Sequence, residues 1–211
     1  MNQNFSISGA YKEAYAIIKP RFWTIIGQYL LIFFVLSILF SVLLGKGAIL
    51  GSIITAYIGM KWALAWVNKG SFKFDDLFEN LSLKKFIYFV LAIALVVLSV
   101  VGGMILLIIP GIIFAVRLMF VKYIIIENDF TPMQALRESK RITKGCRWKL
   151  FWFSIVAVLV VLLGFICLIV GIFFAAPLIA LATASVYKTL RDQAKTETTE
   201  TVIEVVEVVA A

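Results

Sequence analysis

Three long runs without a single charged residue constrain this chain most: residues 23–44, 86–109 and 151–176. A helix that crosses the hydrocarbon core of a bilayer needs roughly 20 consecutive apolar residues, so each run is long enough to cross once. The composition agrees, because 63% of the residues are hydrophobic and only 15% are charged. In a soluble domain, about a quarter of the residues are charged. The sequence therefore predicts an all-α integral membrane protein.

The three runs belong to a unit that is repeated along the chain. Each unit has an amphipathic helix, a basic and aromatic segment, an apolar helix, a turn and a returning helix, and we expect the units at residues 8–68, 72–128 and 131–190. Unrelated membrane hairpins would give similar spacings, but a true repeat is the favoured interpretation. The predicted fold is a polytopic domain of six transmembrane helices in three hairpins, within residues 1–191. The predicted structural turns contain Gly45, Gly47, Pro110, Gly111 and Gly171.

Each predicted hairpin follows a helix with apolar residues on one face, a spacing typical of helices that lie on a surface. The first has Tyr11, Ala14, Tyr15 and Ile18; the second has Phe74, Leu77, Phe78 and Leu81; the third has Pro132, Ala135, Leu136 and Ser139 and continues through Cys146. We expect these three helices in the cytoplasmic interface of the membrane.

Lysine and arginine are distributed unevenly between the connections. They gather before the first apolar run, in the two connections between units and after the last unit, whereas the predicted turns contain only Lys46. By the positive-inside rule, the turns lie outside and both termini lie in the cytoplasm. The predicted location is the cell membrane, with multiple passes. Residues 192–211 are rich in Thr, Glu and Val and predict a disordered tail, with a docking segment for a protein partner as the alternative.

Three cations fall inside the predicted spans: Lys61, Arg117 and Lys122. Charges within a membrane are unfavourable and usually face protein or water. Lys61 and Lys122 lie close enough to the cytoplasmic ends of their spans to extend to the headgroups. Arg117 has two interpretations: it reaches the outer headgroups or backbone carbonyls, or it faces a polar cavity and binds an anionic group such as a lipid phosphate. These three residues are the candidate ligand-binding residues.

The third amphipathic helix has a basic face made of Arg137, Lys140, Arg141 and Lys144. We interpret this face as a contact for anionic lipid headgroups, since each charge near the surface contributes about 1 kcal/mol. A docking face for a protein partner is the alternative. Nucleic acid is not an expected partner, because the face lacks the interleaved aromatic residues that stack on bases.

The chain lacks recognisable catalytic signatures. It contains no histidine, which removes the commonest general base and metal ligand. It has no phosphate-binding loop, no HExxH sequence and no nucleophile elbow, which are the signatures of common hydrolase and nucleotide sites. We therefore predict no catalytic residues, no metal, no cofactor and no enzymatic activity.

Three segments together resemble a known membrane domain. They are the run Leu107-Ile-Ile-Pro110-Gly111-Ile-Ile-Phe-Ala-Val-Arg117, then Ala135-Leu136-x-x-Ser139, then Lys144-Gly145-x-x-Trp148. This pattern, best over residues 70–190, resembles the membrane domain of glycerophosphoryl diester phosphodiesterases and related bacterial six-helix proteins of uncharacterised function. In those enzymes a separate soluble domain, with carboxylates and histidines that bind metal, performs the hydrolysis. The resemblance therefore implies a lipid-facing membrane module without hydrolase activity.

The leading prediction is a non-enzymatic membrane module that binds or senses lipids, or that scaffolds membrane partners. Its expected partners are anionic membrane lipids, together with other proteins or further copies of the chain. The first alternative is a small transporter or channel with a path near Arg117. The second alternative is a lipid-modifying enzyme.

Overall fold

A computed structural model describes residues 5–44, 48–73, 82–106, 108–128, 130–166 and 170–210. These residues form helices and short connections without any strand, which confirms the all-α class. In chain order the elements are α1 (Ile7–Ile18), η1 (Lys19–Arg21), α2 (Phe22–Leu44), α3 (Ala48–Lys69), α5 (Leu83–Leu106), α6 (Ile108–Arg117), α7 (Val121–Glu127), α8 (Pro132–Ile142), α9 (Arg147–Ile166) and α10 (Val170–Ala210).

Three helical segments of the described chain are long and apolar enough to cross a membrane: Ile7–Leu36, Leu83–Met104 and Arg147–Phe165. Only 22%, 17% and 17% of their most apolar windows are buried inside the protein. Surfaces of this kind need an apolar environment outside the protein, which lipid provides. The finding agrees with the predicted membrane class and with the first helix of each predicted hairpin.

The return segment of the second predicted hairpin is not one continuous helix. It is divided into α6 with 10 residues and α7 with 7 residues, separated by a turn at residues 118–120. At 1.5 Å per residue, neither helix reaches across the roughly 30 Å of the hydrocarbon core. The six predicted spans are therefore not shown, and this second return departs most clearly from the expectation.

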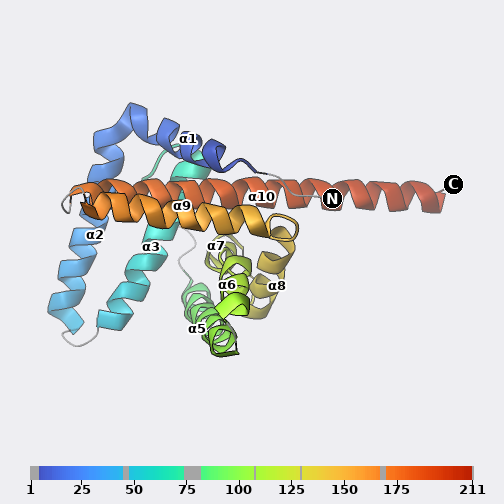
Figure 1. The fold of residues 1–211 in the computed structure, drawn as a ribbon, viewed down its shortest axis with the longest axis horizontal. Coiled ribbons are helices and arrows are strands. Elements are labelled where there is room, and N and C mark those ends of the chain that lie inside the picture. The colour runs from blue at the N-terminus through green and yellow to red at the C-terminus, as the bar shows by residue number, and fades with distance from the viewer. Residues whose placement is uncertain are drawn as a thin grey trace.

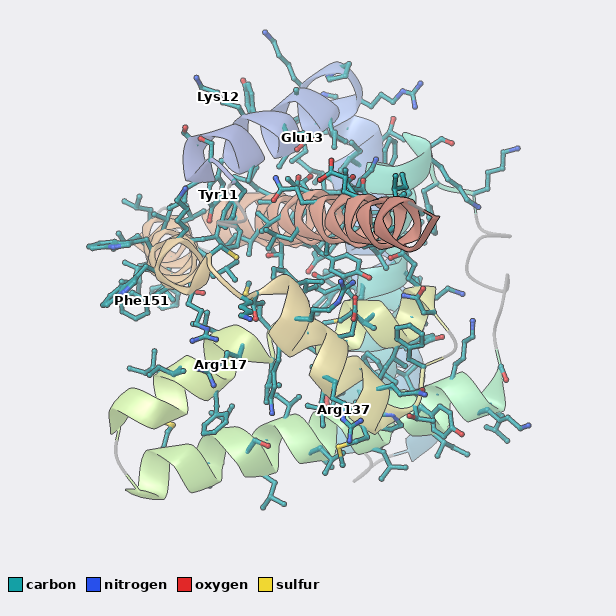
Figure 2. The ribbon with its side chains drawn as sticks, turned by 90° about the vertical axis from the view of Figure 1, so that its right-hand side faces the viewer. Tyr11, Lys12, Glu13, Arg117, Arg137 and Phe151 are labelled. Carbon is teal, nitrogen blue, oxygen red and sulfur yellow. The ribbon has the colours of Figure 1, made fainter. Side chains whose placement is uncertain are left out.

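The helices pair as three hairpins that point in different directions. The pairs are α2 with α3, α5 with α6, and α9 with α10. In Figure 1, α2 and α3 run steeply down the view, α9 and α10 cross it lengthwise, and α5 and α6 are strongly foreshortened. In the view turned by 90°, α5 and α6 run lengthwise and α9 and α10 are seen end on (Figure 2). This arrangement differs from a bundle of parallel spans that share one membrane normal.

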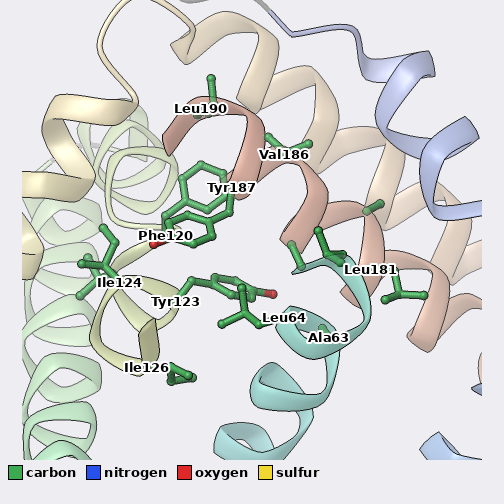
Figure 3. Close-up of a cluster of buried hydrophobic side chains, with 14 of the residues drawn as sticks. Ala63, Leu64, Phe120, Tyr123, Ile124, Ile126, Leu181, Val186, Tyr187 and Leu190 are labelled. Atoms are coloured by element: carbon green, nitrogen blue, oxygen red, sulfur yellow. The ribbon is translucent and has the colours of Figure 1, made fainter. Parts of the chain in front are cut away.

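The buried core lies where the three hairpins meet. It joins α1, the first halves of α2 and α5, the second half of α3, α7, α8, the start of α9 and the part of α10 at residues 181–194. Near its centre the ring of Tyr187 lies 5.8 Å from that of Phe120 and 5.6 Å from that of Tyr123, measured between centroids. Figure 3 shows these rings between α10 and the helices that face it. Aromatic pairs at such distances stabilise a core beyond their buried area alone.

The outer halves of the hairpins have the opposite character. Large apolar side chains are exposed there on α2, α5 and α9, including Phe34, Leu98 and Leu163. A water-soluble monomer rarely exposes contiguous apolar surface on this scale. The described chain therefore combines a protein-like core at the hairpin bases with hairpin arms whose exposed surface is apolar.

Helix α8 follows the sequence prediction closely over its length. Thr131 caps its N-terminus, and a capping box links the Thr131 and Gln134 side chains with the backbone of the first turn, an arrangement that satisfies N–H groups at the helix start. Its buried face is made of Ala135, Leu136, Ser139 and Ile142. The predicted continuation through Cys146 is wrong: α8 ends at Ile142, and Gly145 has a φ of 93°. Such a φ is accessible to glycine and reverses the chain before α9 begins.

Helix α1 matches its predicted face only in part. Ala14 and Ile18 are buried as expected, together with Ala10, but Tyr15 is 59% exposed. The helix is therefore rotated toward its smallest side chains, because alanine permits the closest approach to α10 and α9. Lys12 and Glu13 are exposed (Figure 2). The second amphipathic helix, predicted from Phe74 to Leu81, lies outside the described residues.

Glycine pairs, and not the predicted turns themselves, mark the tips of two hairpins. Pro110 and Gly111 lie inside α6, so the prediction that placed a reversal at these two residues is wrong. Gly171 is the second residue of α10, and the turn predicted around it falls on residues 167–169, outside the described part. A Cβ on Gly103 would lie 3.0 Å from the Cα of Gly111, and a Cβ on Gly164 would lie 2.8 Å from the carbonyl oxygen of Gly171. Both hairpins thus use a glycine pair for close helix approach near the tip. Gly45 and Gly47 fall on residues 45–47, outside the described part.

The C-terminal segment differs from the disordered tail that its composition predicts. Helix α10 has 41 residues and continues to Ala210, and Figure 1 shows it extending past the rest of the molecule. Its first half is packed in the core, so each added residue only propagates an existing helix and avoids the unfavourable nucleation step. The hydroxyls of Thr196 and Thr199 also donate to the carbonyls four residues earlier.

Candidate functional site

The three cations predicted to bind a ligand lie on three different elements. Lys61 lies on α3, Arg117 is the last residue of α6, and Lys122 lies in the first turn of α7. All three are partly buried. The groove between α1 and α9, described below, is lined by none of them.

Arg117 occupies a helix end and not the middle of a continuous span. Its positive charge lies at the C-terminus of α6, where the helix dipole favours a cation. The hydroxyl of Ser139 on α8 donates a hydrogen bond of 2.8 Å to the backbone carbonyl of Arg117. The Nε atom of Arg117 is buried and has no hydrogen-bond partner in the described structure. Figure 2 shows the side chain between α6 and the helices above it.

The basic face of α8 is exposed to the surroundings. Arg137, Lys140 and Arg141 lie on the side of α8 away from the buried stripe, and Lys144 is exposed in the turn that follows the helix. Arg141 forms an ion pair of 2.7 Å with Glu138 and also donates 3.4 Å to the carbonyl of Ala194. These contacts tie Arg141 to the protein, so the face presents mainly the other three cations. Figure 2 labels Arg137, which lies in the middle of this helix.

Exposed aromatic residues follow directly on the basic face. Trp148 is 76% exposed and Trp152 is 56% exposed, both in the first turns of the apolar helix α9. Tryptophan concentrates at the level of lipid headgroups because its ring is apolar and its N–H is polar. Along the chain, exposed cations are therefore followed by exposed tryptophans and then by an exposed apolar helix. A membrane has the same order from outside inward: charged headgroups, the interface and the hydrocarbon core.

An open groove lies between the start of α1 and α9. Its volume is about 670 Å³, within the range of ligand pockets in proteins. The lining is mostly apolar but includes two serines and one cation: Phe5, Ser6, Ile7, Ser8, Tyr11, Lys149 and Val156. No sequence pattern predicts this groove, because it forms between segments far apart in the chain. The only local signal was the serine before α1, a good N-cap residue.

A polar junction connects the ends of the three returning segments, and the sequence pattern does not predict it. The Glu127 carboxylate at the end of α7 accepts hydrogen bonds from Asn68 on α3, at 3.3 Å, and from the hydroxyl of Tyr187 on α10, at 2.8 Å. It also forms an ion pair with Arg191 on α10. An acid placed directly after the apolar Ile124–Ile126 segment was the available signal.

Two basic side chains satisfy carbonyl groups at the end of α3. Lys188 donates 3.0 Å to the carbonyl of Val67, and Arg21 donates 3.0 Å to the carbonyl of Gly70. The last carbonyls of a helix have no partner within it, and cations near them also interact favourably with the dipole. The Lys188 bond connects the first hairpin with α10. The Arg21 bond connects the end of α3 with η1, which precedes α2.

No family model, curated protein or solved structure matches this chain. The resemblance to the membrane domain of glycerophosphoryl diester phosphodiesterases therefore stays a prediction. Among the described residues, no group of three or more acidic, cysteine or histidine side chains is arranged to hold a metal ion. The candidate functional features of the described chain are the basic face, the groove, Arg117 and the polar junction.

Proposed function

We propose that this chain is a non-enzymatic membrane module that binds anionic lipid. The observation that carries the proposal is the order of α8 and α9: the exposed cations Arg137, Lys140 and Lys144 are followed at once by Trp148 and an apolar helix of membrane length. Three cations at a lipid surface attract anionic headgroups, at about 1 kcal/mol for each charge.

The proposed topology places α8 and both termini at the cytoplasmic surface, with the hairpin tips directed away from it. The distribution of Lys and Arg along the chain supports this orientation,. Six spans would require the three hairpins to align along one membrane normal, which differs from the directions seen in Figure 1. Labelling of single cysteines from either side tests the topology, and external labelling at position 140 would exclude it.

The lipid proposal is tested by native mass spectrometry of the purified full chain with equal amounts of phosphatidylglycerol and phosphatidylcholine. The wild type should retain phosphatidylglycerol in preference. A variant with Arg137, Lys140 and Lys144 all changed to Gln should lose that preference at least about fivefold, the effect of one charge of about 1 kcal/mol. The control Lys12→Gln removes an exposed cation from α1 and should keep the preference. Equal retention of both lipids by the wild type would refute the proposal.

A transport path near Arg117 receives less support. The residue ends a short helix, and its carbonyl is engaged by Ser139 of α8. We therefore place Arg117 within the lipid-binding proposal, as a second point where a guanidinium can bind a phosphate.

A further inference from the structure

The groove between α1 and α9 changes from polar to apolar along its length. Lys149, Phe153 and Val156 follow one another at spacings of four and three residues on α9, which places them on one face of the helix,. Lys149 and Val156 line the groove. They are separated by roughly 10 Å along the helix axis at 1.5 Å per residue. We propose that this groove binds one anionic glycerophospholipid, with the phosphate near Lys149 and an acyl chain along Val156.

The start of α1 adds a second feature that suits a phosphate. Ser6 caps the helix, and its hydroxyl accepts from the backbone N–H of Gly9 at 3.2 Å. The hydroxyls of Ser6 and Ser8 lie 3.0 Å apart, and both residues line the groove. The first backbone N–H groups of a helix carry partial positive charge and point toward such a site. The lysine and the helix start thus bring positive charge to the same groove from two elements.

The inner wall of the groove contains an unsatisfied polar atom. Tyr11 packs on Phe153, with ring centroids 5.4 Å apart, and Phe5 meets the same ring edge-on at 6.3 Å. The hydroxyl oxygen of Tyr11 is buried and has no hydrogen-bond partner in the described structure. A buried hydroxyl without a partner is unfavourable, so this wall contains one polar atom that the described protein does not satisfy.

The position of the groove also fits a lipid and not a free anion. The first turns of α9 carry the exposed Trp148 and Trp152 on either side of Lys149 in the sequence, which indicates the depth of the headgroups. Most of the lining is apolar, so inorganic phosphate would leave it unfilled. This inference rests on the proposed function and assigns it a specific site.

The test uses the full chain in nanodiscs that contain phosphatidylglycerol or phosphatidylcholine with a photoreactive diazirine in the acyl chain. Labelled peptides are mapped by mass spectrometry, and labelling at Tyr11 and Val156 is divided by labelling at the exposed Leu162 of α9. The ratio should be higher for phosphatidylglycerol. Lys149→Gln should lower it about fivefold for that lipid, the effect of one lost headgroup charge. Excess inorganic phosphate should leave it unchanged.

Two further variants separate the groove from its surroundings. Ser8→Trp adds bulk at the rim and should remove the preferential labelling, whereas Val158→Trp changes an exposed position of the same helix that does not line the groove and should not. Wild-type ratios in both Lys149→Gln and Ser8→Trp would overturn the groove proposal. If the triple Gln variant of α8 still lost phosphatidylglycerol in that case, the proposed function would stand without this site. If the wild type did not prefer phosphatidylglycerol at all, the proposed function itself would fail.

Discussion

The hydroxyl of Tyr187 donates a hydrogen bond of 2.8 Å to the carboxylate of Glu127, and this bond connects α10 with the end of α7. The same carboxylate accepts from Asn68 of α3 and pairs with Arg191 of α10. One acidic side chain therefore joins segments from all three hairpins. A junction of this kind holds the hairpin bases together although their tips diverge.

We expect Glu127→Gln to destabilise the protein by about 1–3 kcal/mol, because Arg191 and Tyr187 would lose a charged acceptor at a partly buried site. Tyr187→Phe should cost about 0.5–1.5 kcal/mol. The double variant should cost less than the sum of the two, since both remove the same bond. Thermal unfolding in detergent measures these effects. Thr189→Ala, which removes only a hydroxyl bond within α10, serves as the control, and additive losses would contradict a shared junction.

The glycine pairs at the hairpin tips give a comparison between neighbouring positions. A Cβ on Gly111 would lie 2.9 Å from the backbone nitrogen of Met104, whereas a Cβ on Gly102 would meet nothing within 4 Å. Gly111→Ala should therefore destabilise by about 1–3 kcal/mol through overpacking. Gly102→Ala should be neutral or stabilise by up to about 1 kcal/mol, because alanine favours a helix. Equal unfolding midpoints for the two variants would contradict the close approach of α5 and α6.

Arg117 provides a prediction that separates charge from geometry. Arg117→Lys keeps the positive charge at the end of α6 but loses the planar fork that binds a phosphate through two parallel bonds. If the guanidinium binds an anionic headgroup, this variant should retain less phosphatidylglycerol while its unfolding midpoint stays near that of the wild type. Native mass spectrometry and thermal unfolding measure the two quantities. Unchanged lipid retention in both Arg117→Lys and Arg117→Gln would limit this residue to packing against α8.

Cys146 should react slowly in the folded protein. Its side chain is 1% exposed, and burial raises the pKa of the thiol from 9.0 to about 11. At pH 8 only about one thiol in a thousand would be a thiolate, which is the reactive form. Alkylation by iodoacetamide in a Cys167→Ser background should therefore be much slower than that of Lys144→Cys, an exposed position in a background that also carries Cys146→Ser. Similar rates would contradict the burial of Cys146.

The same pKa shift gives a direction for stability at high pH. The unfolded thiol loses its proton near pH 9.0, whereas the folded thiol keeps it until about pH 11. The stability that burial of the neutral thiol provides is fully present below about pH 9 and is lost as the pH rises through 11. Cys146→Ser should remove this contribution to the pH dependence, which unfolding measured between pH 8 and 11 would detect.

Helix α10 should show two levels of protection from amide hydrogen exchange. Between residues 181 and 194 its side chains belong to the core, whereas beyond Lys195 the described side chains are exposed. An amide hydrogen exchanges when its helix opens locally. Such opening costs little free energy where few buried apolar contacts stabilise the helix. We expect fast exchange beyond residue 196 and slow exchange around Leu190, measured on the full chain. Uniform slow exchange would indicate that a partner or a second copy covers the end of the helix.

Several features could be predicted from the sequence because they depend on neighbouring residues. The charge-free runs are a local property, and they already predict helices that need lipid. The buried face of α8 and its Thr131 cap also follow from spacing and from the preference of threonine for helix starts,.

Other features were decided only by contacts between distant segments. No local pattern reveals that Glu127 meets Asn68 and Arg191, that Phe5 packs on Phe153, or that α10 extends as a helix beyond its buried half. Periodicity states which face of a helix is apolar, but the partner of that face depends on the direction in which each hairpin leaves the common core. The sequence by itself therefore determined the all-α class and the buried face of α8. The tertiary structure decided the rotation of α1, the polar junction, the groove at Lys149 and the different directions of the three hairpins.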